Sequence, residues 1–307
     1  MITNLSPQAQ SFLADMDRVQ QMVSDASRQV SSGLRISQAS DDPDVISRLL
    51  QLRAALQKNT QVTSNLGQAQ TDANVSESAL SSATQLMDQA VSLASQGATA
   101  TTDATGRQTL ASQVEAILEQ MVTYSQTQSA GKYVFSGDDA TSPSYQIDLT
   151  QPNGVDQLIV TSATRLVENP AGGSFPVSET AQTIFDARNT DGTLASDNVF
   201  AALTNLYNGL MNNDTTAITN SIGSLQQASD HLNTCLAFYG NVQNRIQDAT
   251  SFSGNYNVQL QTQISQEQDA DVAAASLELS QGTTQIQAAF EMQARIPKTT
   301  LFDFLSS

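Results

Sequence analysis

The side chains best suited to chemistry in this sequence are His231 and Cys235, four residues apart in a helical pattern. That spacing places an imidazole and a thiol on one face of a helix, where they could hold a metal ion or form a nucleophile–base pair. Two ligands are too few for a closed metal site, and no nucleophile motif surrounds the single histidine. We therefore expect both side chains to pack beside Leu232 and Leu236, and we predict no catalytic residue.

Acidic residues gather at two places that could suggest calcium. One is Asp138-Asp139, and the other runs from Asp186 to Asp191-Gly192. A calcium-binding loop of the EF-hand type alternates its acidic ligands and ends on a glutamate, and neither place has that spacing. We interpret Asp191-Gly192 as a turn, and we predict neither a metal site nor a cofactor.

The composition is unusual for an enzyme and unsuited to nucleic acid. Only 14% of the 307 residues are charged and 5% are aromatic, with no tryptophan. The formal net charge of −17 opposes binding to nucleic acid and to an anionic membrane surface. No apolar run of membrane-spanning length occurs, and residues 1–8 lack the features of a secretory signal. We expect no membrane insertion, and either a cytoplasmic protein or one exported without a cleaved signal peptide.

The elements that must position any site are long helices. Apolar or small residues recur with gaps alternating between four and three, which is typical of a helix that packs along another helix. The first two stretches cover about residues 8–32 and 43–96. A third helix is predicted from a capping box, Thr105 to Gln108, to about Gly131.

A short segment separates the first two helical stretches. Its sequence is Ser31-Ser32-Gly33-Leu34-Arg35-Ile36-Ser37-Gln38-Ala39-Ser40-Asp41-Asp42-Pro43. Gly33 can end the first helix without strain, and Asp42-Pro43 suits a helix start, with an acidic N-cap followed by proline. We interpret the segment as a shaped joint, in which Arg35 and Asp41 are the best candidates for contacts that fix the angle.

The middle of the chain changes character. Residues 132–195 carry short β-rich stretches punctuated by turn residues. The expected strands are 132–137, 145–149, 157–161, 166–167, 175–177 and 183–185. Helical periodicity returns at Ser196, runs from Asp214 to Ile264, and resumes at Val272 after a four-residue shift.

The predicted fold is mainly α, a long antiparallel helical bundle or coiled coil formed by both chain ends, with a small β-rich inserted domain. Residues 1–42 form an N-terminal arm that pairs with a C-terminal arm, 265–307. Residues 43–131 and 196–264 form the bundle, and 132–195 the outer domain. Two paired helices bury little apolar surface, so we expect the arms to become ordered on assembly.

Several motifs, in order, resemble those of one family. Ser31-Ser32-Gly33-Leu34-Arg35-Ile36 followed by Asp41-Asp42 is similar to the N-terminal signature of bacterial flagellins. Tyr239-Gly240-Asn241-Val242-Gln243-Asn244-Arg245-Ile246 resembles the flagellin Gly-x-x-Gln-Asn-Arg segment, and 271–275 with 287–305 resembles the terminal helix. The resemblance covers about residues 1–135 and 200–307. Within the family the chain is most similar to the flagellin-like hook-associated proteins of the hook–filament junction, although Leu34 is the choice of filament flagellins.

The resemblance implies a structural subunit of the bacterial flagellum that joins hook to filament by polymerising in a tubular lattice. It implies export by the type III apparatus to the outside of the cell. The implied partners are other copies of the chain, another hook-associated protein on the hook side, flagellin on the filament side, and an export chaperone. The residues it assigns to the joint and to assembly are Ser32, Gly33, Leu34, Arg35, Ile36, Asp41, Asp42, Pro43, Asn244, Arg245, Phe290, Leu301, Phe302, Phe304 and Leu305.

Three other functions remain open at this point. The chain could be filament flagellin itself. It could also be a secreted coiled-coil effector or adhesin, or an enzyme whose site lies in the β-rich insertion. An effector would not need the Gly-x-x-Gln-Asn-Arg segment. An enzyme would need a polar constellation that the insertion does not show.

Overall fold

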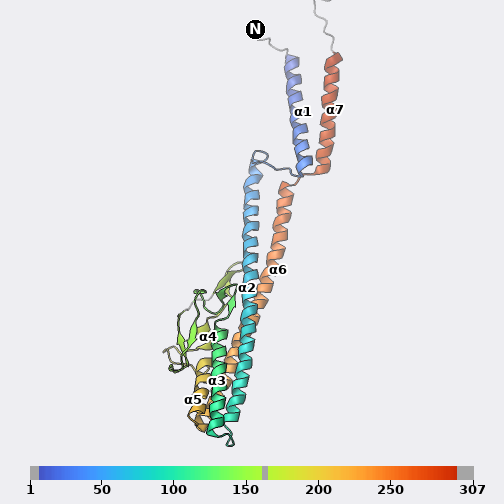
Figure 1. The fold of residues 1–307 in the computed structure, drawn as a ribbon. Coiled ribbons are helices and arrows are strands. Elements are labelled where there is room, and N and C mark those ends of the chain that lie inside the picture. Colours follow the sequence, from blue (N-terminus) through green and yellow to red (C-terminus); the bar gives the residue numbers. More distant parts are fainter. Residues whose placement is uncertain (1–6, 161–164, 296–307) are drawn as a thin grey trace, which may run out of the picture. The chain divides into compact units, whose positions relative to one another are not determined.

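The structure, a computed structural model, describes residues 7–160 and 165–295. The chain divides into two compact units, which are described separately. The first unit contains residues 1–57 and 257–307, and the second unit contains residues 58–256. Both are built mainly from helices, which confirms the predicted class (Figure 1).

The first unit contains two helices that pack side by side, α1 (Pro7–Ser32) and α7 (Val272–Arg295). They run antiparallel. The end of α1 lies at the start of α7, where the amide of Ala270 donates to the carbonyl of Gly33 at 2.9 Å. At Gly282 the helices come so close that a Cβ atom would lie 2.4 Å from Cγ2 of Val23. The unit also contains residues 43–57 of α2 (Pro43–Gly97) and 257–268 of α6 (Thr215–Gln268).

The second unit is organised by the remaining lengths of α2 and α6. Asn59 contacts Ser253, and farther along α2 Glu77 contacts Gln243, so the two helices are antiparallel. Two shorter helices, α3 (Ala104–Ser125) and α5 (Val199–Met211), pack against each other in the same unit.

The helix starts follow capping chemistry, but one predicted cap was wrong. The carboxylate of Asp103 accepts the amide of Gly106 at 2.7 Å, so α3 begins at Ala104 and Thr105 lies inside the helix. A carboxylate two positions earlier caps the helix in place of the expected Thr105 box. The helix also ends at Ser125, earlier than the predicted Gly131.

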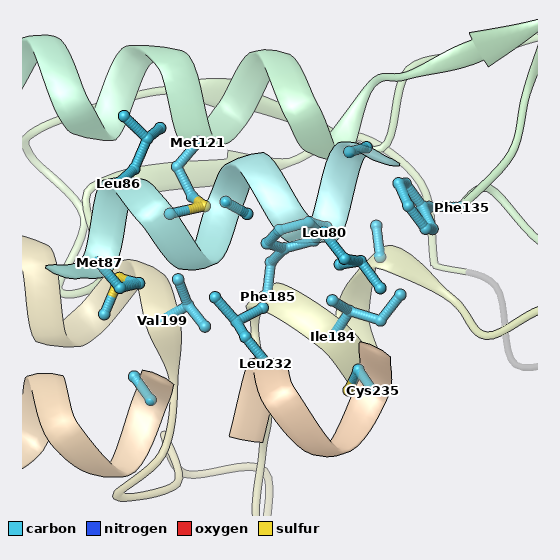
Figure 2. Packing of buried hydrophobic residues seen from close by; sticks show 14 of the residues in the cluster. Leu80, Leu86, Met87, Met121, Phe135, Ile184, Phe185, Val199, Leu232 and Cys235 are labelled. Atoms are coloured by element: carbon cyan, nitrogen blue, oxygen red, sulfur yellow. The ribbon is translucent and has the colours of Figure 1, made fainter. Parts of the chain in front are cut away.

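The core of the second unit is one continuous cluster contributed by helices and by the β-rich region. Figure 2 shows Leu80 and Met87 of α2 beside Met121 of α3 and Phe185 of the β-rich region, with Leu232 of α6 nearby. Aromatic rings meet edge-on or stacked within it. The Phe135 and Phe185 centroids are 5.8 Å apart, as are those of Phe185 and Phe200. Such packing holds the β-rich region against the helices.

The β-rich region consists of three separate two-stranded antiparallel hairpins within its described residues. Tyr145 pairs with Gln157, and Val167 pairs with Phe175. The hairpins are β1 (Gln128–Ser129) with β2 (Lys132–Tyr133), β3 (Tyr145–Ile147) with β4 (Val155–Gln157), and β5 (Leu166–Glu168) with β6 (Ser174–Pro176).

Two strand predictions were wrong. The stretch 183–185 belongs to a short helix, α4 (Ala181–Phe185), because the Thr180 hydroxyl accepts the amide of Thr183 at 3.2 Å and starts a helical turn. The strand expected at 157–161 begins two residues earlier and covers Val155–Gln157. It begins there because Gly154, whose φ is +72°, ends the turn directly before Val155.

Candidate functional site: the joint and the paired arms

The joint starts where α1 ends. Gly33 has a φ of +72°, and its amide donates to the carbonyl of Gln29 at 2.8 Å. This left-handed residue directly after the helix is the C-terminal cap predicted from the sequence. The hydroxyl of Ser32 donates to the carbonyl of Arg28 at 2.7 Å and accepts the amide of Leu34 at 3.1 Å, which directs the chain away from the helix axis.

Two connecting segments are bonded to each other at the joint. Leu34 and Asp269 form an isolated antiparallel bridge. The carbonyl of Gln268 accepts the amides of Arg35 at 2.7 Å and Ile36 at 3.2 Å. Ile36 is buried at this crossing, with 2% of its surface exposed. The segment after α1 and the segment before α7 therefore behave as one structural element.

The guanidinium of Arg35 ties this crossing to both long helices. Nη2 donates to the carbonyl of Glu267 at 2.7 Å, and Nη1 lies 3.2 Å from the carboxylate of Asp42. Two further arginines of α2 reach α6. Arg48 forms an ion pair with Glu267 at 2.9 Å, and Arg53 donates to the side-chain oxygen of Gln268 at 2.9 Å. Both of these partners of Arg35, Glu267 and Asp42, belong to the same chain.

Asp41 and Asp42 shape the start of α2. The amides of Ser37 and Gln38 each donate to the Asp41 carboxylate at 2.8 Å. These backbone bonds, that from Gln38 first, hold the pKa of Asp41 below its ordinary value. The Asp42 carboxylate accepts the amide of Val45 at 3.3 Å, and Pro43 is the first helical residue. Both features of the predicted helix start are confirmed.

The other residues that the family resemblance implied for assembly lie outside the joint. Asn244 and Arg245 are in the second unit, where the Arg245 guanidinium lies 4.4 Å from the centre of the Phe175 ring. This cation–π contact holds β6 on α6. Phe290 is on α7 and is 59% exposed. Leu301, Phe302, Phe304 and Leu305 lie outside the described residues.

The chemistry-bearing pair on α6 is embedded in packing. Burial raises the pKa of the Cys235 thiol to about 12, with the carboxylate of Glu179 contributing, so the thiol stays protonated at neutral pH. His231 lies 2.8 Å through Nε2 from the carbonyl of Thr183 and 3.4 Å through Nδ1 from Asp197. Within the described part of the chain, no three His, Cys, Asp or Glu side chains are grouped to hold a metal.

A buried polar centre in the β-rich region was missed from the sequence. Asp186 is fully buried and accepts bonds from the amides of Asn153 at 2.9 Å and Asn198 at 2.8 Å. Arg188 forms an ion pair with it at 2.8 Å, and the Tyr145 hydroxyl lies 3.3 Å away. All partners are protein groups, so the centre joins hairpins and helices. Asn198 caps α5, because its side-chain oxygen accepts the amide of Ala201 at 2.9 Å, and nothing in the local sequence connects it to Asp186.

Solved structures share this fold. A protein assigned as a flagellar hook-associated protein from Vibrio parahaemolyticus matches with a TM-score of 0.63 and 17% identity, covering 75% of this chain and all of that one. Flagellar hook associated protein-3 from Legionella pneumophila matches at 0.60 and 14%, covering 70% and 98%. FlgL from Xanthomonas campestris matches at 0.54 and 15%, covering 68% and 99%. A search among curated proteins finds no relative.

Family models identify both ends of the chain. The model of the bacterial flagellin N-terminal helical region matches residues 3–140, and that of the bacterial flagellin C-terminal helical region matches residues 213–305. None of the described helices is long and apolar enough to cross a membrane. The matched regions contain the joint, both arms and the long helices. The chain therefore belongs to the bacterial flagellin family, and its role in the flagellum is structural and not enzymatic.

Proposed function

We propose that the chain is the flagellar subunit that joins hook to filament, polymerising through its paired arms. The observation that carries the proposal is the surface of the arms. Large apolar side chains remain uncovered there, with Leu277 60%, Phe290 59% and Met292 71% exposed on α7 and Leu13 48% exposed on α1. Apolar side chains of this size, repeated along a helix pair, fit a surface that neighbouring subunits cover.

The choice of the junction over the filament rests on the likeness in fold. The similar structures from Vibrio parahaemolyticus, Legionella pneumophila and Xanthomonas campestris are those of hook-associated proteins or FlgL, and this chain covers 98% or more of each. We propose accordingly that one face of the assembly contacts another hook-associated protein and that another face contacts flagellin. An export chaperone holds the C-terminal region before export, and the subunit acts outside the cell.

Deletion of the gene tests the position in the flagellum. The junction role predicts cells with intact hooks, no filaments, and flagellin monomers in the medium. Complementation with the full chain should restore filaments. Hooks that carry normal filaments in the deletion strain would overturn the proposal. A deletion strain with junctions retained and only the filament missing would identify the chain as filament flagellin.

A truncation tests whether the chain ends mediate assembly. Removal of residues 297–307 should leave a soluble, helical protein that no longer supports filament attachment. The matched readouts are circular dichroism of the purified variant and electron microscopy of the complemented strain. Normal attachment by the truncated protein contradicts the assembly role of this end.

A further inference from the structure

The seam between α2 and α6 in the second unit changes character near residue 60. Beyond this point in the second unit the two helices bury apolar side chains. The first of these are Val62, Leu66, Ala69 and Ala73 on α2 and Ile246 and Ala249 on α6, and three of them are alanines. Alanine methyl groups have nearly the same shape at every turn, so they distinguish poorly between one register of the two helices and the next.

A polar layer interrupts this seam. Asn59 is 4% exposed and Ser253 is fully buried. The Asn59 amide donates to the backbone carbonyl of Ser253 at 2.9 Å, and the Ser253 hydroxyl donates to the Asn59 side-chain oxygen at 3.0 Å. The Thr63 hydroxyl lies 2.5 Å from that of Ser253 and donates to the carbonyl of Asn59 at 2.9 Å. The Asn59 carboxamide and the Ser253 residue thus pair with each other across the seam.

We propose that the layer of Asn59, Thr63 and Ser253 fixes the register of α2 against α6. A slip by one helical turn would leave the Asn59 amide and the Ser253 hydroxyl buried against apolar side chains. Each unpaired group would then cost about 1–3 kcal/mol. The alanines of the same seam, Ala69, Ala73 and Ala249, would lose much less. A single buried polar position fixes the register of coiled coils in the same way.

Large buried side chains of both helices, such as Leu80 and Leu232, also resist a slip, whereas the ion pairs of α2 outside the layer are more exposed. The pair of Lys58 with Glu168 joins α2 to the β5–β6 hairpin at 2.7 Å, with its two side chains 69% and 51% exposed. Ion pairs in water contribute little, so this contact defines the register weakly. Arg245 on Phe175 joins α6 to the same hairpin and is also exposed. After a slip, water can replace the partners of these exposed groups, but it cannot reach the buried Asn59 and Ser253 side chains.

The register matters beyond the layer because both helices are continuous. A one-turn slip displaces one helix against the other by about 5.4 Å. Residues farther along the same two helices, such as Glu77 of α2 and Gln243 of α6, would no longer meet at their hydrogen-bond distance of 2.6 Å. The layer therefore sets which residues of the two helices can meet along the rest of the second unit.

Spin-label distances test the proposal on the full chain. With Cys235→Ala as background, labels at Ser78→Cys and Ser251→Cys, two exposed positions on α2 and α6, report the offset along the helix axes. The parent should give one distance. The double variant Asn59→Leu with Ser253→Ala should add a second, shifted by about 5 Å. Its melting temperature should stay the same or rise, because both partners are replaced by apolar groups.

The control makes the same exchanges at exposed positions of α2, Asn65→Leu with Ser95→Ala, and should keep the single distance. A single unshifted distance in the double variant overturns the proposal, whether or not stability falls. If leucine does not fit at position 59 and the variant fails to fold, Asn59→Val with Ser253→Ala carries the same measurement and is judged by the same two outcomes.

Discussion

The second unit buries large side chains in one continuous cluster, whereas the first unit buries a few separated ones. In the second unit Tyr145, Tyr239, Phe135 and Phe185 are all less than 2% exposed. Among the described residues of the first unit, the buried apolar ones are Met16, Ala26, Ile36, Leu49, Leu260 and Ala275. The same family fold thus contains a part that folds around its own core and a part that depends on backbone bonds and close helix contact.

The difference indicates how the work of the molecule is divided. A large core gives the second unit its own stability, so the β-rich region is held firmly on the helices. The first unit places large apolar side chains on its surface and joins its arms through the bonded segments around Arg35 and Gln268. Its stability should increase when other subunits cover that surface.

The largest expected effect lies in the second unit. Asp186→Ala removes the buried carboxylate that accepts bonds from Asn153, Asn198 and Arg188, and leaves these donors without their partner. We expect the free energy of unfolding of the second unit to fall by about 3–5 kcal/mol. Denaturant unfolding measures it. The exposed Asp191→Ala is the control and should change stability by less than about 1 kcal/mol. An equally small loss in Asp186→Ala would show that this centre does not secure the β-rich region.

Two glycine substitutions should act in opposite directions. In Gly282→Ala the new methyl group would lie 2.4 Å from Cγ2 of Val23, so α7 must move away from α1. We expect the pairing of these helices to weaken by about 1–3 kcal/mol. In Gly223→Ala on α6 nothing lies within 4 Å, and the helix should gain about 0.5–1 kcal/mol. Hydrogen exchange of the α7 amides should accelerate in the first variant alone. Unchanged exchange of the α7 amides in Gly282→Ala would show that the methyl group does not weaken the pairing of α1 with α7.

The periodicity of the sequence was enough to predict the long helices, and Gly33 with Asp42-Pro43 was enough to predict the joint. Both signals are local, and local backbone preferences decided the outcome. The hydrogen bond from the Arg35 amide to the Gln268 carbonyl could not be predicted from the sequence. It links segments more than two hundred residues apart through backbone groups that every sequence has. The strand predicted at 183–185 failed for a related reason. Ile184 and Phe185 favour strands, but the cap at Thr180 and burial of both side chains in the core favour a helical turn.

A smaller effect is expected at the joint. Arg35→Gln loses the bond to the Glu267 carbonyl and the ion pair with Asp42. Since the Arg35 side chain is 43% exposed, we expect a loss of about 1 kcal/mol, confined to the first unit. Limited proteolysis within residues 33–42 should become faster while the melting of the second unit stays unchanged. Arg18→Gln, whose side chain is 80% exposed, is the matched control. Equal rates of proteolysis in the two variants would show that Arg35 does not stabilise the joint.

The smallest effect is a pH dependence that both units share. The backbone amides of Gln38 and Ser37 hold the pKa of Asp41 below its ordinary value of 3.8. In the second unit the hydroxyl and amide of Thr150 do the same for Asp148, and those of Thr193 do so for Asp191. A lowered pKa means that the stabilisation is fully present above about pH 4 and is lost as the pH falls through the lowered value.

Carbon-13 titration of the Asp41 carboxyl group, with hydrogen exchange of the Ser37 and Gln38 amides, follows this loss at the joint. In Asp41→Asn the acid-dependent exchange of the two amides should disappear, while the turns at Asp148 and Asp191 should titrate as before. Because the described part of the first unit buries only a few side chains, protonation of Asp41 should open the joint at a pH where the second unit remains folded. Simultaneous unfolding of both units in acid would show that the core of the second unit does not make it independent of these turns.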